Sequence, residues 1–313
     1  MDTAEPGSRP RHAQGGGLAA FDGVLFCVTL FAWGTSWIAL KINAATSVPI
    51  ETSIFYRFVI AGLIMAVWVA IRGWKIRYGV GLHLRFAAMG FTIFSVNFML
   101  YAHASAHLVS GLMAVMFSSV AILNVLVAAA VFRQPLDPKV LVAALVGVSG
   151  LVLIFYPEIA GQDFDPAALG AIGLCLVANL LFCTGNMMSA HIQKRGVPVV
   201  EANMIGMLYG MGWSFLAVLV RGEAFIFEVS IAYVGSLAIL AILSSVIAFA
   251  AYLTLLGRQG PGRAGYLTVT FPLVALTIST VFEGYTWPPL AIVGLGFVLA
   301  GNAIVALSAA RAR

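Results

Sequence analysis

The sequence predicts an all-α polytopic membrane protein with ten transmembrane helices, arranged as two inverted five-helix repeats. Three observations predict this fold class: an apolar composition, ten apolar segments of membrane-spanning length, and a second half that repeats residues of the first. Of the 313 residues, 61% are hydrophobic and only 9% are charged, against roughly 25% charged in ordinary soluble domains. The mean hydropathy of +1.01 leaves no room for a sizeable water-soluble domain.

Each apolar segment approaches the ~20 residues that a helix needs to cross a bilayer. In chain order the segments cover about 23–42, 52–71, 86–104, 108–132, 140–156, 167–190, 203–220, 231–256, 264–282 and 289–309. The preceding residues 1–20 contain Pro6, Pro10 and three consecutive glycines. They lack the apolar core of a secretory signal, so we expect a disordered cytoplasmic tail.

Residues of the first half return about 150 residues later and in the same order. Glu51 returns as Glu201, and with a slightly longer offset Phe117 returns as Phe271. A repeat with an odd number of spans must be inverted relative to its twin. Many secondary transporters are built in this way, with the substrate at the repeat interface near the bilayer midplane. The predicted domains are the tail (1–20), the first five-helix repeat (21–157) and the second (158–313).

Positive charge gathers in one set of loops. With a cytoplasmic N-terminus, only Lys41 and Arg221 lie in outer loops and Arg57 lies within a span, while the other Lys and Arg residues lie inside. This bias follows the positive-inside rule. It predicts a multi-pass protein of a bacterial inner (plasma) membrane with both termini in the cytoplasm. It also accounts for the net charge of +5 without a nucleic-acid partner.

Four short motifs fall in these spans or at their ends. They are Trp33-Gly34-Thr35-Ser36, Tyr56-Arg57-Phe58 with Ala61, Pro272-Leu273-Val274, and Phe282-Glu283-Gly284. Over about residues 24–308 the chain resembles the EamA family of the drug/metabolite transporter superfamily. It departs from the family's pattern at Ser118, which stands where the first repeat would match Pro272, and at Arg133-Gln134, where a Gly-Glu pair is common. The resemblance implies a transporter, because some members export amino acids, including a subgroup that exports aromatic amino acids.

Charge inside a membrane is costly and usually functional. No Asp or Glu lies near the centre of a predicted span, and Arg57 is the only cation well inside one. The favoured interpretation of Arg57 is a side chain that extends to the outer interface, and the alternative is a conformational lock or a substrate contact. Without a central carboxylate there is no obvious proton relay, so facilitated diffusion or weakly coupled export is favoured over proton antiport.

The scarcity of cations in the spans also restricts the substrate. A phosphorylated compound would need Lys or Arg around it, so an uncharged or zwitterionic metabolite fits better, held by hydroxyls, amides and aromatic faces. The candidate substrate-binding residues are Trp33, Ser36, Asn97, Tyr101, Ser118, Asn179, Asn186, Ser245, Tyr252 and Thr270. Polar residues in spans also bond helices to one another, and this alternative stays open for each. Tyr101 and Tyr252 are candidate gates, and Pro272 is a candidate hinge.

Other functional classes find little support in the residues. His103 and His107 have a spacing that permits metal binding on a helix, but they fall at a short turn without a third ligand, so neither a metal nor another cofactor is expected. A membrane-embedded enzyme would need a nucleophile with its base or a metal cluster, and a channel would need rings of charge or a filter sequence.

We therefore predict a monomeric secondary transporter that works by alternating access in the lipid bilayer. It would export amino acids or related small zwitterionic metabolites. The first alternative is an exporter of other neutral or cationic metabolites or drugs. A channel or a membrane-embedded enzyme is less favoured.

Overall fold

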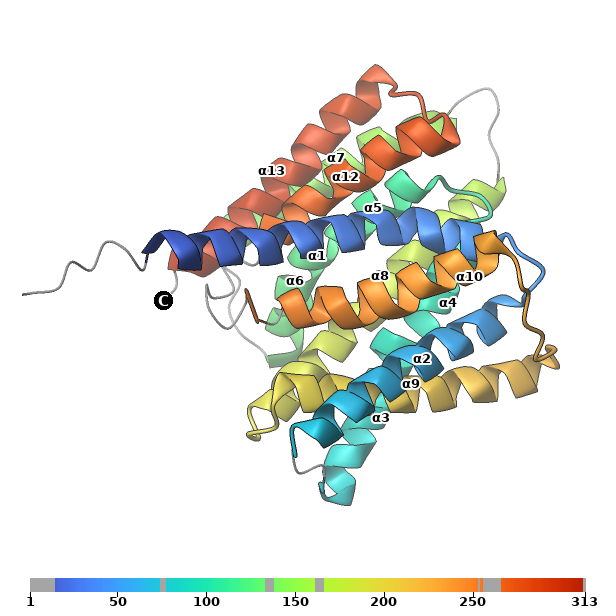
Figure 1. Cartoon of the computed structure of the whole chain (residues 1–313). Coiled ribbons are helices and arrows are strands. Elements are labelled where there is room, and N and C mark those ends of the chain that lie inside the picture. Colours follow the sequence, from blue (N-terminus) through green and yellow to red (C-terminus); the bar gives the residue numbers. More distant parts are fainter. Residues whose placement is uncertain are drawn as a thin grey trace, which may run out of the picture.

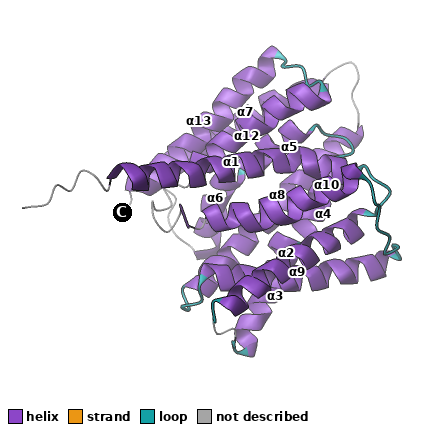
Figure 2. Cartoon of the chain, in the orientation of Figure 1, coloured by secondary structure: helices purple, strands orange, loops and turns teal. Residues whose placement is uncertain are grey.

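The structure is a computed structural model that describes residues 15–73, 77–132, 138–160, 166–252, 254–255 and 266–311. Within these ranges every regular element is a helix (Figure 2). Eight helical segments are long and apolar enough to cross a membrane, and two shorter apolar helices follow, Thr270–Glu283 and Pro289–Val305. The prediction of an all-helical protein with many membrane spans is confirmed, while the count of ten spans stays a prediction.

The helices of the two halves form one bundle. The first half comprises α1 (Gly15–Ala44), α2 (Ile50–Ile71), α3 (Val80–Phe94), α4 (Val96–Ala104), α5 (Ser110–Ser118), α6 (Val120–Phe132) and α7 (Pro138–Ala160). The second comprises α8 (Pro166–Gln193), α9 (Val199–Arg221), α10 (Ile231–Ala238), the π-helix η1 (Ile239–Ile247), α12 (Tyr266–Glu283) and α13 (Pro289–Arg311). Figure 1 shows α7, α12 and α13 on one side of the bundle and α2, α3 and α9 on the other, with α1 and α10 between them.

Several predicted spans are not continuous α-helices. The third is interrupted between α3 and α4 at Ser95, whose φ of −140° and ψ of −89° are not helical, and the fourth is interrupted between α5 and α6 at Ser119. In the second half, the corresponding spans contain η1 and, inside α12, Pro272. Prolines and π-bulges are common causes of bends in helices. The irregular positions therefore fall at matching places in the two halves.

Helices of the first half pack against their counterparts in the second, pairing α2 with α9, α5 with α12, and α7 with α13. Glu51 at the start of α2 contacts Arg221 at the end of α9. Ser110 at the start of α5 binds Glu283 at the end of α12 through its backbone nitrogen, at 2.9 Å. The first two pairs therefore run antiparallel.

Glycines allow α7 and α13 to touch. A Cβ atom on Gly150 would lie 2.5 Å from the carbonyl oxygen of Gly294, and one on Gly301 would lie 2.7 Å from that of Ala143. Small residues permit this approach of two membrane helices. Because the contact moves backward along α7 as it moves forward along α13, this pair also runs antiparallel.

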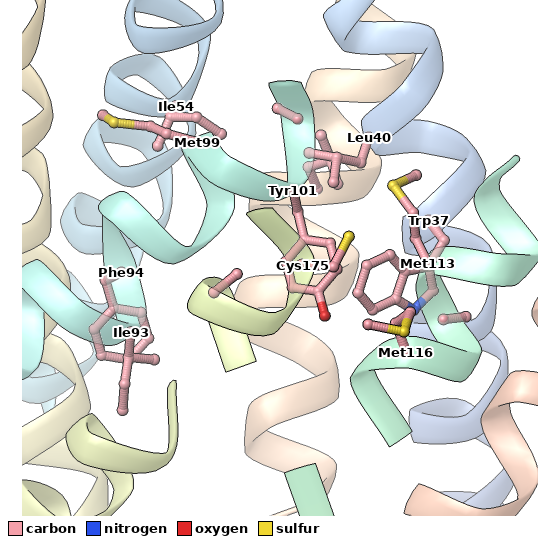
Figure 3. Packing of buried hydrophobic residues seen from close by; sticks show 14 of the residues in the cluster. Trp37, Leu40, Ile54, Ile93, Phe94, Met99, Tyr101, Met113, Met116 and Cys175 are labelled. Atoms are coloured by element: carbon pink, nitrogen blue, oxygen red, sulfur yellow. The ribbon is translucent and has the colours of Figure 1, made fainter. Parts of the chain in front are cut away.

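The core between the halves is rich in aromatic rings and methionines. Figure 3 shows Trp37, Tyr101 and Met116 gathered in it. Trp37 lies 4.9 Å from Tyr101, measured between ring centroids. Phe117 lies 6.1 Å from Phe271 by the same measure, so two residues that match across the repeat meet inside the bundle.

Candidate functional site

A cavity of about 440 Å³ opens between helices of both halves, and we call it the α2–α9 cavity. Its walls include Met65 and Trp68 of α2, Asn203 and Met207 of α9, and Phe249, which follows η1. Pockets for small molecules typically have ~300–1,000 Å³ and apolar walls with few polar groups. The volume and lining of this cavity therefore suit a small metabolite.

The α2–α9 cavity lies toward one end of the bundle, which we call the Tyr78 end. There the Tyr78 hydroxyl donates to the carboxylate of Glu201. Burial, together with the hydrogen bond and the negative charge of Glu201, raises the pKa of Tyr78 to about 12. Tyr78 therefore remains a protonated donor at neutral pH. Nearby, His83 Nδ1 and the hydroxyl of Tyr209 lie 3.0 Å apart beside a second hollow of about 280 Å³.

Ion pairs join the helices at the opposite end, which we call the Glu51 end. Glu51, whose side chain is only 4% exposed, lies 3.0 Å from His103 Nε2 and 3.1 Å from Arg221 Nε. Lys41 Nζ lies 2.8 Å from a carboxylate oxygen of Glu283. These contacts tie α2 to α4 and α9, and α1 to α12. The Glu51 end is therefore held closed by contacts between the two halves.

A loop contact adds to this closure. Glu228 accepts hydrogen bonds from the backbone nitrogen of Ser47 at 2.9 Å and from its hydroxyl at 2.6 Å. Hydrogen bonds from Ser230 and Ser47 hold the pKa of Glu228 below its ordinary value. The carboxylate is therefore charged at neutral pH and links the connection after α9 to the turn between α1 and α2.

Two predicted site residues lie beside the α2–α9 cavity. Trp33 of α1 and Tyr252, beyond η1, are 5.1 Å apart between ring centroids, and Trp33 lies 5.6 Å from Phe249. Phe249 itself lines the cavity. Trp33 and Tyr252 therefore back one of its walls from opposite halves of the chain, although neither lines it directly.

Arg57 lies inside the bundle rather than at its surface. The residue is 2% exposed, its Nε donates to Ser245 Oγ at 3.1 Å, and its Cζ lies 4.0 Å from the centroid of the Phe98 ring. The favoured expectation that Arg57 extends to the outer interface is therefore wrong. The hydroxyl and the ring, both on neighbouring helices, retain the guanidinium at this depth.

The predicted amides Asn97 and Asn179 form hydrogen bonds between helices. Asn97 Nδ2 donates to the carbonyl oxygen of Ala178 at 2.9 Å. Asn179 accepts from the hydroxyl of Tyr101 at 2.5 Å and donates to the carbonyl oxygen of Met116 at 2.8 Å. All three predicted residues are buried. In this conformation they connect α4, α5 and α8.

The remaining predicted residues are more scattered. Asn186 is half-buried, and its Nδ2 donates to Oδ1 of Asn124 at 3.1 Å. The hydroxyls of Ser36 and Ser118 each donate to a carbonyl of their own helix at 2.7 Å. Thr270 is half-buried in α12. The structure thus brings Trp33 and Tyr252 next to a wall of the cavity, pairs Ser245 with Arg57, and places the other predicted residues elsewhere in the bundle.

Sequence reasoning did not single out the residues that line the cavity. Asn203 was one available signal, because it is a polar residue at the start of an apolar segment and two residues after the repeated Glu201. Trp68 and Phe249 gave no comparable signal, because aromatic residues in membrane helices are most often packing residues. Their shared position depends on how α2, α9 and η1 meet.

Membrane helices from two repeated halves around a small cavity define a membrane transporter. Residues 23–156 and 169–307 each match the EamA-like transporter family. The chain belongs to this family, and the family's domain occurs in it twice. The resemblance found from the sequence motifs is therefore confirmed.

Several relatives match over most of their length. The "Probable amino-acid metabolite efflux pump" of Escherichia coli (strain K12) is 22% identical over 90% of this chain and 93% of its own. The "Uncharacterized inner membrane transporter YedA" of the same strain is 24% identical over 91% of this chain and 90% of its own. "Protein PagO" of Salmonella typhimurium (strain LT2) is 22% identical over 84% and 85%.

One solved crystal structure is also similar to the chain. It superimposes with a TM-score of 0.65 at 17% identity, over 94% of this chain and 99% of that chain. At this identity, the likeness concerns the fold alone.

Proposed function

We propose that this protein is a secondary exporter of small metabolites that works by alternating access, with amino acids and related zwitterions as its substrates. The observation that carries the proposal is the asymmetry of the bundle, which has a cavity toward the Tyr78 end and ion pairs across the Glu51 end. A carrier exposes its site to one side of the membrane at a time. The name of one relative, an efflux pump for amino-acid metabolites, supports export.

Two inverted five-helix repeats would supply the two conformations. The antiparallel pairing of α2 with α9, of α5 with α12 and of α7 with α13 supports this arrangement, in which α12 and α13 complete ten spans. Glu51 and its repeat match Glu201 lie at opposite ends, and each binds a partner there. If the halves exchanged conformations, the Glu51 end would open as the Tyr78 end closed.

By the charge bias of the loops, the Tyr78 end and both termini would face the cytoplasm, with the protein in a bacterial inner membrane. The α2–α9 cavity would then be open to the compartment from which an exporter takes its substrate. A monomer suffices for this cycle, because helices of one chain supply every wall residue of the cavity.

The lining of the cavity supports the substrate class. Among the described lining residues none is charged, and the polar groups are those of Gln193, Asn203 and Thr254. Trp68 and Phe249 offer aromatic faces, which attract an ammonium group. An uncharged or zwitterionic metabolite fits such walls better than a phosphorylated one.

Counterflow tests the proposal. Proteoliposomes with the purified protein are loaded with one unlabelled amino acid or related metabolite at a time, and uptake of the labelled compound is measured without a proton gradient. A carrier gives faster uptake into loaded than into empty vesicles, whereas a channel does not. The proposal fails if no compound of the panel shows this stimulation. Uptake that requires a proton gradient and one titrating carboxylate would instead contradict the expectation of facilitated or weakly coupled export.

The orientation makes a separate prediction. Single cysteines replace Gly79 at the Tyr78 end and Thr286 beside Glu283, in a chain whose three native cysteines have been removed. A membrane-impermeant thiol reagent added to intact cells should label position 286 and leave position 79 unlabelled. Labelling of position 79 alone would reverse the proposed topology.

A further inference from the structure

Arg57 differs from the other cations that lie between helices. Lys41 and Arg221 each contact a carboxylate, whereas no carboxylate among the described residues lies within ion-pair distance of Arg57. Its one hydrogen bond to a described residue runs from Nε to Ser245. The two terminal nitrogens of the guanidinium therefore have donors to spare.

The surroundings of Arg57 compensate its charge only in part. The rings of Phe98 and Phe58 lie 4.0 and 5.3 Å from its Cζ, measured to their centroids. A ring face attracts a cation but offers no lone pair to an N–H donor. Buried charges are normally paired, because an unpaired one forfeits its hydration. An arginine in this state is a strong site for an incoming anion.

Arg57 lies between the Glu51 end and the α2–α9 cavity. Along α2 it follows Glu51, which belongs to the closed end, and precedes Met65, which lines the α2–α9 cavity. Its partner Ser245 lies one helical turn before Phe249, another wall residue. A ligand that moved deeper from the cavity, past Phe249, would therefore reach the guanidinium before it reached the closure.

We infer that Arg57 is the binding site for a carboxylate group of the transported substrate. The planar guanidinium matches a carboxylate with two parallel hydrogen bonds, and Ser245 fixes its orientation through Nε. This inference rests on the proposed function and narrows its substrates to compounds that carry a carboxylate. Amines without a carboxylate are disfavoured, because Arg57 repels their charge.

Binding can be tested without knowledge of the natural substrate. Benzoate and its uncharged counterpart benzamide are titrated into the purified protein, and the thermal unfolding temperature is followed, because a ligand of the folded state raises it. Benzoate should stabilise the wild-type protein and benzamide should not. Arg57→Gln should remove the effect of benzoate, with an affinity loss of roughly 10- to 100-fold. Arg57→Lys should retain part of it.

A matched control is Arg85→Gln, because Arg85 near the start of α3 donates from Nη1 to the carbonyl of Gly81 in its own helix. This variant should keep the full response to benzoate. If Arg57→Gln does not fold, the response of Arg57→Lys to benzoate is the test. This variant keeps the positive charge but loses the planar guanidinium, so its response should be weaker than that of the wild type. The inference is overturned if benzoate and benzamide stabilise the protein equally, or if the Arg57 variants respond like the wild type.

Transport separates this inference from the proposed function. Each acid that shows counterflow is compared with its carboxamide, and the acid should be preferred at least about tenfold by the wild type and not by Arg57→Gln. Equal counterflow of acids and carboxamides would support the proposed exporter but contradict a carboxylate-binding site at Arg57. Arg57-dependent benzoate binding without counterflow of any compound would support the carboxylate site but contradict the proposed exporter.

Discussion

At the scale of single residues, Asn179 shows how a polar side chain can serve the fold of a membrane protein. Its amide accepts from Tyr101 and donates to the carbonyl of Met116 and the hydroxyl of Ser119. These bonds bridge α4, α5 and α8 where water cannot replace them. Polar bonds between membrane helices commonly have this role.

Asn179→Ala should therefore lower the stability of the protein. The hydroxyl of Tyr101 would lose its acceptor while buried, and a buried group without a partner costs ~1–3 kcal/mol. Thermal unfolding in detergent measures the effect. Asn186→Ala, which removes one bond from a half-buried residue, should cost less. A normally stable Asn179→Ala protein that no longer binds substrate would instead place this amide in the substrate site.

Arg57 shows which features of the site could be predicted from the sequence and which could not. Its place inside a span is readable from the apolar segment around it, and so is the fact that a charge there has a purpose. Its contacts with Phe98 and Ser245 are not readable, because they depend on how α2, α4 and η1 meet. The same holds for the cavity, whose walls come from residues far apart in the chain.

At the scale of helices, the contact between α7 and α13 ties the two halves together. The backbones touch at Gly150 and Gly294, where a Cβ atom on either would lie 2.5 Å from the other's carbonyl oxygen. Because backbone cannot move aside as a flexible side chain can, the two helices must separate to admit even a methyl group.

Gly150→Ala should accordingly lower the unfolding temperature. Gly296→Ala is the matched control, because it lies on α13 with no atom within 4 Å of the added Cβ. Alanine favours a helix over glycine by up to ~1 kcal/mol, so the control should be neutral or stabilising. Equal melting of the two variants would show that the close contact of α7 and α13 does not hold the halves together.

Pro272 lies inside α12, and its repeat match Ser118 directly precedes the interruption at Ser119, which favours bending at these points. Proline cannot donate a backbone hydrogen bond and therefore weakens the helix locally. If α12 bends there during transport, Pro272→Ala should slow counterflow several-fold while leaving substrate affinity unchanged. An unchanged rate of counterflow would contradict the proposal that Pro272 is a hinge.

The helices themselves were largely predictable, because length and hydropathy determine what can span a bilayer. The breaks at Ser95 and Ser119 were not, since serine is tolerated inside helices and its sequence neighbours give no stop signal. Matches such as Glu51 with Glu201 predicted an inverted second half, but the packing of each helix against its counterpart was seen only in the structure. The backbone geometry at the breaks depends on how the helices pack in the bundle, and the sequence alone does not determine it.

At the scale of the whole molecule, the proposed cycle requires contacts at the Glu51 end that are strong enough to hold it closed and weak enough to let it open. The side chains of Lys41 and Arg221 are 31% and 54% exposed, whereas those of Glu283 and Glu51 are 10% and 4% exposed. Such half-buried pairs are worth more than the ~0–1 kcal/mol of a fully exposed pair, although water still reaches their cations. A few such pairs bias an equilibrium between two conformations without fixing it. This balance is what a carrier requires.

The most direct test of alternating access is to hold the Glu51 end closed. Lys41→Cys and Glu283→Cys, in a chain without its native cysteines, are joined by a cleavable bifunctional thiol reagent that spans the two side chains. Counterflow should stop on crosslinking and return on reductive cleavage, whereas a chain with Lys41→Cys alone should keep transporting after the same treatment. Transport at an undiminished rate through the crosslinked protein would contradict the account, because the substrate would then cross without the Glu51 end ever opening.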